Sequence, residues 1–535
     1  MESTTFRIKL AVAVAALIGA VAPAAAHGAA AAPLKQPRVS PATFATGAGT
    51  TVAYTARRKG TVTIVVQRRS GTTWKHVGRL RHRARAGRNR LAFRGKVAGR
   101  ALTAARYRLV LRATTGQAIT VRFRVTAPAP AGRPSGSRFL WGVSSSAFQS
   151  EGQACPSNWQ RYTDSGDEEP YLTSVDFRGR YKKDIALAAK LGTNTFRFGI
   201  NWACVEPQPG VFDEAQLAYY DDVVKTIVDH GMQPVPTFHH FVLPAWVMDQ
   251  GAWTNEKTVG DFVAYTAKLI PRWAARTKYW LTFNEPVCDL IFGITKGEFA
   301  ATDLVTVADR MARAHMRTYD LIHAARPDAM VSSNICESNL PTVGSLTLDA
   351  LFTGRFAAAG KIDMVAIDVY YRQDSTSLQF LLSGGKPWTV RQIPYAMYEQ
   401  LKTYHQRFPK LPLFVSESGM PTDNGLPRPD GLSRGDHLRD NVYWMQRAMA
   451  EGIPVIGYSY WSLTDNYEWG SYRPRFGLYT VDVTTDPTLT RRPTDAVAAY
   501  KCVIAADGVP DDYRPVRDPD GNPTGTTNPL CTGRR

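Results

Sequence analysis

The chain has 535 residues, which excludes a single ordinary core and leaves room for a large domain beside a smaller module. Its hydrophobic fraction of 44% can fill a core of that size. The net charge of +19 is unevenly placed, because no Asp or Glu occurs between His27 and Pro128 while Lys and Arg recur throughout. The basicity therefore belongs to one module near the amino terminus, and the rest of the chain is roughly neutral to slightly acidic.

Residues 1–26 have the pattern of a secretory signal peptide. Two basic residues, Arg7 and Lys9, precede an apolar run at 10–21, and three alanines that follow offer small residues for cleavage. The run is short for a membrane span, and no later segment holds about 18 apolar residues without a charge. The sequence predicts a secreted or cell-surface protein without a membrane span. An uncleaved anchor is the minor alternative.

Six cysteines occur in the chain, and an even number in an exported protein permits disulfides. Cys502 and Cys531 lie close together in the C-terminal tail and are predicted to pair. The other four are expected to be buried free thiols: Cys155, Cys204, Cys288 and Cys336. No Cys-x-x-Cys or histidine-rich spacing is present, so neither a metal site nor an organic cofactor is predicted.

Residues 37–126 are predicted to form a small all-β module. Four runs alternate between apolar and polar residues, with glycine-containing turns between them, which is typical of an antiparallel sandwich. The runs are 61–66, 90–93, 107–111 and 120–125. In pattern alone the module resembles the immunoglobulin-like accessory modules of secreted bacterial proteins.

The arginine-rich run from Arg79 to Arg90 is the most basic stretch of this module. It is a candidate site for an anionic cell-wall or surface polymer, a membrane surface or a nucleic acid. The simpler interpretation is a strand face and turn exposed to water. No aromatic ladder interleaves with the arginines, which disfavours a single-stranded nucleic acid, so no nucleic-acid partner is predicted.

A linker at 127–137, rich in Pro, Gly and Ser, separates this module from a large domain at 138–504, and a tail follows at 505–535. In the large domain, short apolar strands alternate with helical patterns, which predicts a parallel (β/α)₈ TIM barrel. A doubly wound open sheet is the alternative, but it usually brings a glycine-rich phosphate turn after its first strand, and none is found. The expected strands are 139–143, 194–200, 233–238, 279–283, 330–334, 364–370, 413–416 and 454–460. The expected helices are 181–191, 214–230, 257–275, 305–325, 390–407 and 434–452.

Two of these strands end in a glutamate, Glu285 and Glu417. Two carboxylates at the same end of a barrel are what hydrolysis of a glycosidic bond needs, one as acid/base and one as nucleophile. Other strand ends carry amides, imidazoles, carboxylates and indoles, which suit the hydroxyls and the apolar face of a sugar. They are Gln149, Glu151, Arg197, His239, His240, Asn284, Asp368, Tyr370, Trp461, Glu468 and Trp469.

The large domain resembles the β-glycosidases of glycoside hydrolase family 1 over nearly all of residues 138–504. The resemblance is carried by stretches that together are specific, although each alone is a weak signal. They are Phe139–Val143, Gln149–Gly152, Arg180–Ile185, Phe196–Phe198, Thr282–Pro286, Ser416–Gly419, Trp461–Trp469 and Arg475–Leu478.

The resemblance implies a TIM barrel, retention of anomeric configuration and a role for each matching residue. Glu285 would be the acid/base, Glu417 the nucleophile, and Asn284 the partner of the sugar 2-hydroxyl. Arg197 and Tyr370 would contact the nucleophile. The non-reducing-end sugar would be bound by Gln149, His240, Glu468 and Trp469, with Trp461 as its floor.

This chain departs from the family pattern at three strand ends. A Tyr-His-Trp-like run is replaced by His239-His240-Phe241, and the Asn that usually precedes two tyrosines is replaced by Asp368. Asp368 adds a third carboxylate, which is expected to alter sugar preference or pH optimum. Around the nucleophile, Ser416-Glu417-Ser418-Gly419 differs mildly from the usual Thr-Glu-Asn-Gly. The loops are short for the family, which suggests an open cleft.

These features predict a secreted retaining β-glycosidase acting on terminal β-D-glucosyl or β-D-galactosyl residues of an oligosaccharide or glycoside. A carboxylate at Glu468 would repel a 6-phosphate, so unphosphorylated sugars are expected. A transglycosidase or an endo-acting polysaccharide hydrolase of a related barrel family is the first alternative. A catalytically inert carbohydrate-binding protein is the second, although both glutamates are present.

Overall fold

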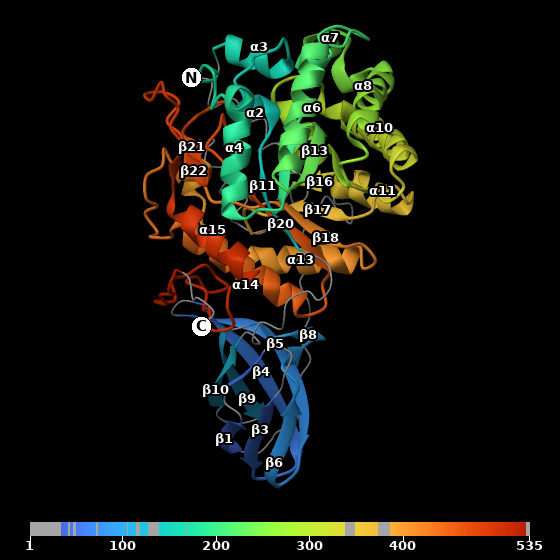
Figure 1. The fold of residues 1–535 in the computed structure, drawn as a ribbon. Helices are drawn as coiled ribbons and strands as arrows, with labels where there is room; N and C mark the ends of the chain where they lie inside the picture. The colour runs from blue at the N-terminus through green and yellow to red at the C-terminus, as the bar shows by residue number, and fades with distance from the viewer. Residues whose placement is uncertain are drawn as a thin grey trace. The chain divides into compact units, whose positions relative to one another are not determined.

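The computed structural model describes residues 34–40, 43–45, 50–70, 73–103, 105–113, 118–126, 139–166, 168–336, 348–372 and 386–530. The predicted signal peptide, the linker at 127–137 and Cys531 lie outside these residues. The chain divides into two compact units, Met1–Ala127 and Pro128–Arg535, and each is described by itself (Figure 1). Among the described residues, no helix combines the length and apolar character needed to cross a bilayer.

The first unit is a sandwich of two β-sheets. One sheet has the order β1-β3-β6 and the other β2-β10-β9-β4-β5. All pairs are antiparallel except β10 with β2, which run parallel. Inward-facing side chains such as Val52, Ile64 and Leu109 are fully buried and form the core. The strands are β1 (Leu34–Ser40), β2 (Thr43–Ala45), β3 (Thr50–Ala56), β4 (Gly60–Ser70), β5 (Thr73–Ala84), β6 (Gly87–Phe93), β9 (Ala105–Ala113) and β10 (Ile119–Thr126), with a small hairpin of β7 (Lys96–Val97) and β8 (Arg100–Ala101).

The second unit is a parallel barrel, as the sequence predicts. Its strands neighbour one another in the order β15-β14-β13-β12-β11-β20-β18-β17-β16. Only Ser333 separates β15 from β16, and these two pair with β14 and β17 respectively. They are therefore two halves of one fifth strand that closes an eight-stranded barrel. The strands are β11 (Leu140–Ser144), β12 (Thr195–Gly199), β13 (Gln233–His239), β14 (Tyr279–Phe283), β15 (Met330–Ser332), β16 (Asn334–Ile335), β17 (Val365–Asp368), β18 (Leu413–Glu417) and β20 (Val455–Trp461).

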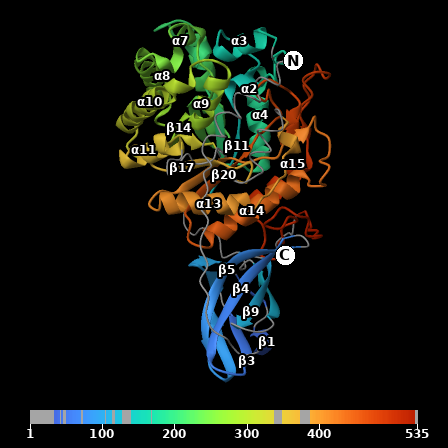
Figure 2. The same ribbon diagram turned by 180° about the vertical axis from the view of Figure 1, so that it is seen from behind.

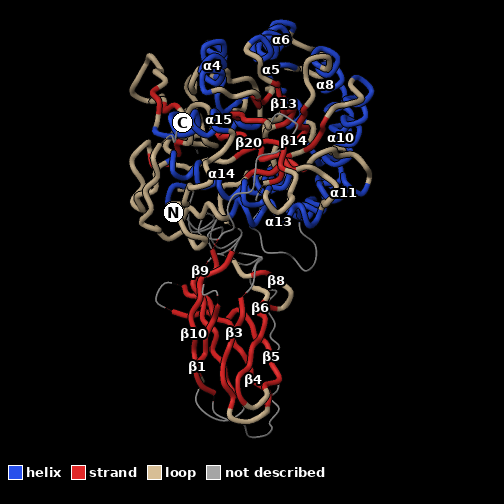
Figure 3. The backbone as a smooth tube through the Cα atoms, turned by 60° about the horizontal axis from the view of Figure 1, so that its bottom comes forward, coloured by secondary structure: helices blue, strands red, loops and turns tan. Residues whose placement is uncertain are grey.

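Helices surround these strands, as Figure 3 shows by colour, and the reverse view in Figure 2 shows helices on that side as well. The long helices are α4 (Phe177–Leu191), α6 (Glu214–Asp229), α8 (Lys257–Trp273), α10 (Leu304–Ala325), α13 (Ala396–Arg407), α14 (Arg434–Met449) and α15 (Asp495–Ala506). Shorter elements are α2 (Ala147–Glu151), α3 (Asn158–Asp164), α5 (Trp202–Val205), α7 (Ala245–Asp249), α9 (Pro286–Thr295), α11 (Thr353–Ala358), η2 (Ala252–Thr254), η3 (Ala301–Asp303), η4 (Leu348–Leu351), η5 (Pro387–Thr389), β19 (Thr422–Asp423), β21 (Pro474–Arg475), β22 (Tyr479–Thr480) and β23 (Arg492–Pro493).

Local sequence explains why these elements form where they do. The Asp213 side chain accepts hydrogen bonds from two amides of the first turn of α6, which supplies partners that the helix itself lacks there. Leu217, Val224 and Ile227 recur at helical spacing on α6 and are fully buried, so one face packs inward. In β12 every residue is buried, as expected for a parallel strand covered on both faces.

Two expectations about the large domain are wrong. The helix expected at 390–407 begins only at Ala396, because Ile393 precedes Pro394 and a residue before proline disfavours helical geometry. The four cysteines expected as free thiols form two disulfides, Cys155–Cys204 and Cys288–Cys336. The paired cysteines are 48 and 49 residues apart, so no local spacing in the sequence indicates the pairs. Cys502 is also disulfide-bonded, whereas its predicted partner Cys531 lies outside the described residues.

Candidate active site

Strand register gathers the predicted polar residues at one end of the barrel. Asp368 on β17 is the direct register partner of Glu417 on β18. Asn284 follows β14, and its backbone N–H donates to the backbone carbonyl of His239 at the end of β13. The carboxyl ends of adjacent parallel strands meet at the same edge, so side chains from several strands converge there. We refer to Arg197, Asn284, Glu285, Asp368, Tyr370 and Glu417 as the carboxyl cluster.

Glu417 lies between two hydrogen-bond donors. Its Oε1 forms an ion pair with the guanidinium of Arg197, and its Oε2 accepts a hydrogen bond of 2.6 Å from the hydroxyl of Tyr370. Arg197 is completely buried and also donates to Asn284 Oδ1 at 2.5 Å and to Thr237. Because both oxygens of Glu417 act as acceptors, the geometry fits an ionised carboxylate held in one orientation.

Glu285 occupies the turn between β14 and α9. Its φ of 39° lies in the left-handed region, which residues with a Cβ rarely adopt, and Pro286 begins the helix directly after it. Burial raises the pKa of the Glu285 carboxyl well above its usual range, and the nearby Asp368 and Glu417 carboxylates raise it further. The environment of Glu285 therefore favours the protonated form, whereas the two donors around Glu417 favour the ionised form.

Asp368 is the third carboxyl of the cluster and is completely buried. Ser416 Oγ donates to its Oδ1 at 2.7 Å, and the amide of Asn334 donates to its Oδ2. Asp368 is also hydrogen-bonded to Glu285. Burial and then Glu417 raise the pKa of Asp368 well above its usual range, while Arg197 opposes that rise. Asp368, which replaces the Asn of the family pattern, is therefore in direct contact with the predicted acid, Glu285.

A second group of predicted residues surrounds Glu468. Trp461 Nε1 donates to Glu468 Oε1 at 2.9 Å, and Gln149 Nε2 donates to Oε2 at 3.1 Å. Burial raises the pKa of Glu468 to about 8, and Glu417 adds to the rise. At neutral pH this side chain therefore carries a proton for much of the time and is not the permanent carboxylate that the sequence predicts.

His240 lies between two indole rings. Its imidazole stacks on Trp461 with a centroid distance of 5.9 Å and on Trp469 with one of 5.7 Å, and both interplanar angles are close to 20°. Burial lowers the pKa of His240 well below its usual range, and Arg197 and His239 lower it further. The ring is thus neutral at physiological pH and can both donate and accept a hydrogen bond. The predicted sugar-binding residues therefore form one contiguous wall beside the carboxyl cluster.

Two strand-end residues point elsewhere. Both carboxylate oxygens of Glu151 accept hydrogen bonds from hydroxyls on α6, those of Tyr219 and Tyr220. His239 contacts Asp289 of α9 at 2.8 Å. Their contacts join helices and loops to the barrel, which is a structural role.

At this site, sequence reasoning missed Asn334, the contact of Ser416 with Asp368, and the disulfide Cys288–Cys336. Asn334 donates to both Asn284 and Asp368, yet it lies at the break in the fifth strand, where no motif marks it. The sulfurs of Cys288 and Cys336 lie within 4.8 Å of a Glu285 carboxylate oxygen. Because these sulfurs are bonded to each other, they are not thiolate ligands for a metal. The disulfide instead ties the start of α9 to the residue after β16, next to Glu285.

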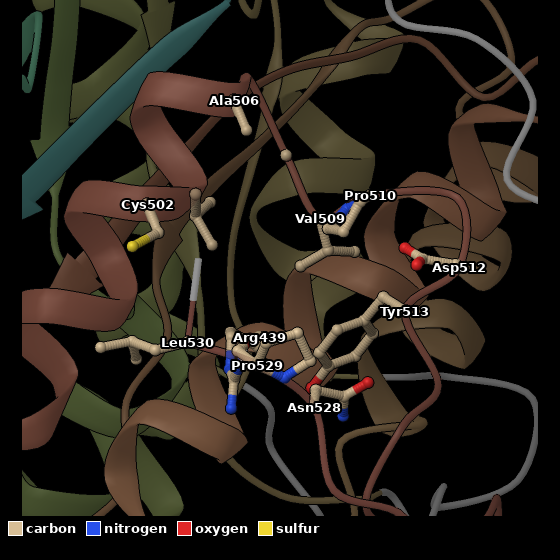
Figure 4. A pocket seen from close by; sticks show the side chains of 12 residues that line it. Arg439, Cys502, Ala506, Val509, Pro510, Asp512, Tyr513, Asn528, Pro529 and Leu530 are labelled. Carbon is tan, nitrogen blue, oxygen red and sulfur yellow. Dashed lines mark hydrogen bonds between the residues drawn. The ribbon is translucent and has the colours of Figure 1, made fainter. Parts of the chain in front are cut away.

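A cavity of about 60 Å³ lies away from the carboxyl cluster, between α14, α15 and the segment that follows α15 (Figure 4). Its lining includes Arg439, Cys502, Tyr513 and Leu530. No residue of the carboxyl cluster lines it. The segment around it is anchored to the barrel, because Asp440 of α14 accepts hydrogen bonds from the Tyr513 hydroxyl and from the amides of Val516 and Arg517.

The arrangement offers two carboxyl groups in opposite states. One is held as an anion by two donors, and the other is kept protonated by burial and by its carboxylate neighbours. Such a pair can protonate a leaving group and attack the atom from which it departs. The adjoining wall of amide, imidazole, carboxyl and indole groups can hold a polyhydroxylated ring.

Comparison with known proteins identifies relatives of the barrel unit. The model of Glycosyl hydrolase family 1 matches residues 134–347 and 366–509. The chain is 26% identical to β-glucosidase 25 of Oryza sativa subsp. japonica, over 69% of this chain and 93% of that protein. It is 28% identical to the chloroplastic galactolipid galactosyltransferase SFR2 of Arabidopsis thaliana, over 58% of this chain and 55% of that protein.

The fold also matches a solved structure. A family 1 β-glucosidase from Thermotoga maritima superimposes with a TM-score of 0.60 at 23% sequence identity. The match covers 71% of this chain and 99% of that structure. It extends the sequence relationship to the fold of the barrel unit.

Proposed function

The chain belongs to glycosyl hydrolase family 1 and is a glycoside hydrolase, and from that premise we propose that it is a secreted retaining β-glycosidase with Glu417 as nucleophile and Glu285 as acid/base. The contrast between these two carboxyls carries the proposal. Glu417 receives donors on both oxygens, whereas burial and two neighbouring carboxylates keep Glu285 protonated. Double displacement requires this difference between its two carboxyl groups.

The reaction follows from these states. Glu285 gives its proton to the glycosidic oxygen, and the aglycone leaves as an alcohol. The carboxylate of Glu417 attacks the anomeric carbon and forms a glycosyl ester. Glu285, now ionised, removes a proton from a water molecule, which cleaves the ester and releases a sugar of the original β configuration. Arg197 and Tyr370 orient the nucleophile and receive its charge when the ester breaks.

Asp368 contributes by keeping the shared proton on the acid, Glu285. Its two oxygens already accept from Ser416 and Asn334, so the hydrogen bond between Asp368 and Glu285 places the shared proton on Glu285. A neighbouring carboxylate makes ionisation of Glu285 less favourable, and the acid form therefore persists to higher pH than it would beside an uncharged residue.

The proposed substrates carry a terminal, unphosphorylated β-D-glucosyl or β-D-galactosyl residue. The names of the rice and Thermotoga relatives support a β-glucoside. Gln149, Glu468 and His240 would hydrogen-bond the hydroxyls farthest from the scissile bond, with Trp461 beneath the ring. Asn284, oriented by Arg197 and Asn334, would bind the 2-hydroxyl.

A transglycosidase is the second candidate, because the galactosyltransferase SFR2 is among the relatives. Both reactions share the glycosyl ester and differ in whether water or an acceptor alcohol cleaves it. The ratio of released sugar to transfer product, measured with increasing concentrations of a galactosyl or glucosyl acceptor, distinguishes them. Transfer product that dominates at low acceptor concentration would favour the second candidate.

The direct test is hydrolysis of a panel of chromogenic β- and α-glycosides by the native protein and by Glu417→Ala. We expect turnover of β-glucosides or β-galactosides that is lost in the variant, and no turnover of α-glycosides. Turnover of an α-glycoside, or full activity of the folded variant, would contradict the proposal. Export is tested separately by recovering the protein from culture medium and sequencing its amino terminus, which is expected to begin near residue 27.

A further inference from the structure

The five-stranded sheet of the first unit presents a face made largely of arginine. On its strands β5, β9 and β10, most of the residues that alternate with the inward-facing positions are basic. We call the following eight side chains the arginine face: Arg79, Arg81, Arg83, Arg106, Arg108, Arg112, Arg122 and Arg124. Seven of them are exposed, and Arg108 is partly buried.

Strand register sets some of these arginines directly opposite one another. Arg106 pairs with Arg124 and Arg108 with Arg122 across β9 and β10. Like charges at directly opposed positions destabilise a sheet. No Asp or Glu lies between His27 and Pro128 to offset them. The fold therefore retains opposed like charges, which a bound anion would offset.

Two simpler explanations do not account for these pairs. Basic residues often protect the edge of a sheet from pairing with other chains, and β5 is such an edge strand. However, β9 is the central strand and β2 pairs with β10 at Arg124, so the Arg106–Arg124 pair does not lie at an edge. Charge for solubility is normally dispersed and mixed in sign, not concentrated in opposed pairs of one sign.

The contacts of Arg108 show which interactions an arginine of this face can make. Arg108 donates to Gln67 Oε1 at 2.7 Å, and its guanidinium lies 4.6 Å from the centre of the Trp74 ring. Within the described residues, no hydrogen bond or ion pair engages the side chains of the other seven. Same-face residues lie about 6.7 Å apart along a strand, and strands about 4.8 Å apart, so the free guanidinium groups form a regular array.

We propose that the arginine face binds a linear anionic polysaccharide that carries carboxylates on successive sugars. Guanidinium groups pair with carboxylates through two parallel hydrogen bonds, and an array of them matches a polymer with repeated charges. This inference is independent of the catalytic proposal, because it concerns the unit outside the family match.

Other polyanions fit the face less well. Single-stranded nucleic acids gain affinity from bases that stack on open aromatic rings, whereas one side of the Trp74 ring is occupied by Arg108. Binding to a membrane surface is strengthened by apolar side chains that enter the bilayer. Among the large apolar side chains described in this unit, Val77 alone is strongly exposed. The partner is therefore more polar than a membrane and needs no stacking platform.

The test is binding of the full chain to immobilised polygalacturonate at low and physiological ionic strength. The variant Arg106→Gln/Arg122→Gln/Arg124→Gln removes three charges from the arginine face. The matched control Arg38→Gln/Arg88→Gln/Arg90→Gln removes three exposed charges from the outer face of the other sheet. We expect the first variant to bind roughly tenfold more weakly or worse, and the control to stay close to the native chain.

The thermal unfolding midpoint of the first variant should equal or exceed that of the native chain, because opposed like charges are removed. Hydrolysis of a small glycoside should be unchanged in both variants, which separates this proposal from the catalytic one. If both variants bound polygalacturonate equally weakly, the net charge of the unit would explain the binding, and the proposal would be overturned. Tighter binding to double-stranded DNA or to phosphatidylglycerol vesicles, or no binding to polygalacturonate, would also overturn it.

Discussion

The carboxyl groups of Glu285, in the turn after β14, and Asp368, at the end of β17, are hydrogen-bonded to each other. Two carboxyls in such contact share one proton, and their titrations are coupled. The other partners of Asp368, which are Ser416 and Asn334, are donors and leave the proton with Glu285. A residue that departs from the family pattern thus controls the protonation of the proposed acid.

Replacement of Asp368 by Asn should shift the alkaline limb of the pH profile of kcat/KM to lower pH. The reaction needs protonated Glu285, which is present below its pKa and lost above it. Removal of the neighbouring carboxylate lowers that pKa, so the alkaline limb should move to lower pH. The surface variant Asp328→Asn removes the same charge outside the cluster and should leave the profile in place. An unmoved alkaline limb in Asp368→Asn would show that Asp368 does not act on this proton.

Discrimination against 6-phosphorylated substrates should depend on pH in the native enzyme. Burial raises the pKa of Glu468 to about 8, so its negative charge is present above that pH and lost below it. The ratio of kcat/KM for a 6-phosphoglucoside to that for the plain glucoside should therefore fall as pH rises through about 8. The variant Glu468→Gln, which is uncharged throughout, should show a higher ratio without this step. The same pH dependence in both proteins would rule out Glu468 as its source.

The disulfide Cys288–Cys336 should support catalysis, not stability alone. It fixes the start of α9, where Glu285 lies, to the end of the fifth strand. Cys288→Ser/Cys336→Ser should lower the free energy of unfolding by roughly 4 kcal/mol in the chain-entropy model and should also lower kcat.

The other disulfide, Cys155–Cys204, provides the control, because its sequence separation of 49 residues is almost equal to the 48 of the first. Cys155→Ser/Cys204→Ser should lose similar stability but retain most of its kcat below the unfolding temperature. Equal effects of the two double variants on kcat would contradict a positioning role for Cys288–Cys336.

Loss of the Tyr370 hydroxyl should slow the chemical step. It donates to Glu417 Oε2 at 2.6 Å, and hydrogen bonds to charged groups contribute more than neutral ones. Tyr370→Phe should lower kcat roughly tenfold to a hundredfold. Tyr371→Phe is a suitable neighbour control, because the Tyr371 hydroxyl donates to the carbonyl of Pro387 instead. A Tyr370→Phe enzyme with native kcat would exclude this contact from the mechanism.

Much of the barrel could be predicted from sequence because its strands are short, apolar and fully buried. The strand at Tyr279–Phe283 has the expected bounds, and the glutamates that follow two strands could be recognised as a pair. Patterns of this kind are local, so the residues that form them are close together in the chain.

The remaining features depend on contacts between distant segments. Asn334 and Ser416 reach Asp368 through strand register, which no local pattern encodes. The two disulfides likewise join cysteines about 50 residues apart. The proton on Glu468 arises from burial, and burial of a single side chain is not readable from its neighbours in sequence. Local pattern predicted the residue types of the site, while their protonation and partners required the fold.

The most direct test of the catalytic account is to trap the glycosyl ester. A 2-deoxy-2-fluoro-β-glucoside with a good leaving group slows hydrolysis of the ester, so the labelled protein can be digested and the modified peptide identified by mass spectrometry. We predict one sugar per chain, attached to Glu417, and no label in Glu417→Ala. A label on Asp368 or Glu285, or turnover of the β-glucoside without any trapped ester, would contradict the assignment of Glu417 as nucleophile.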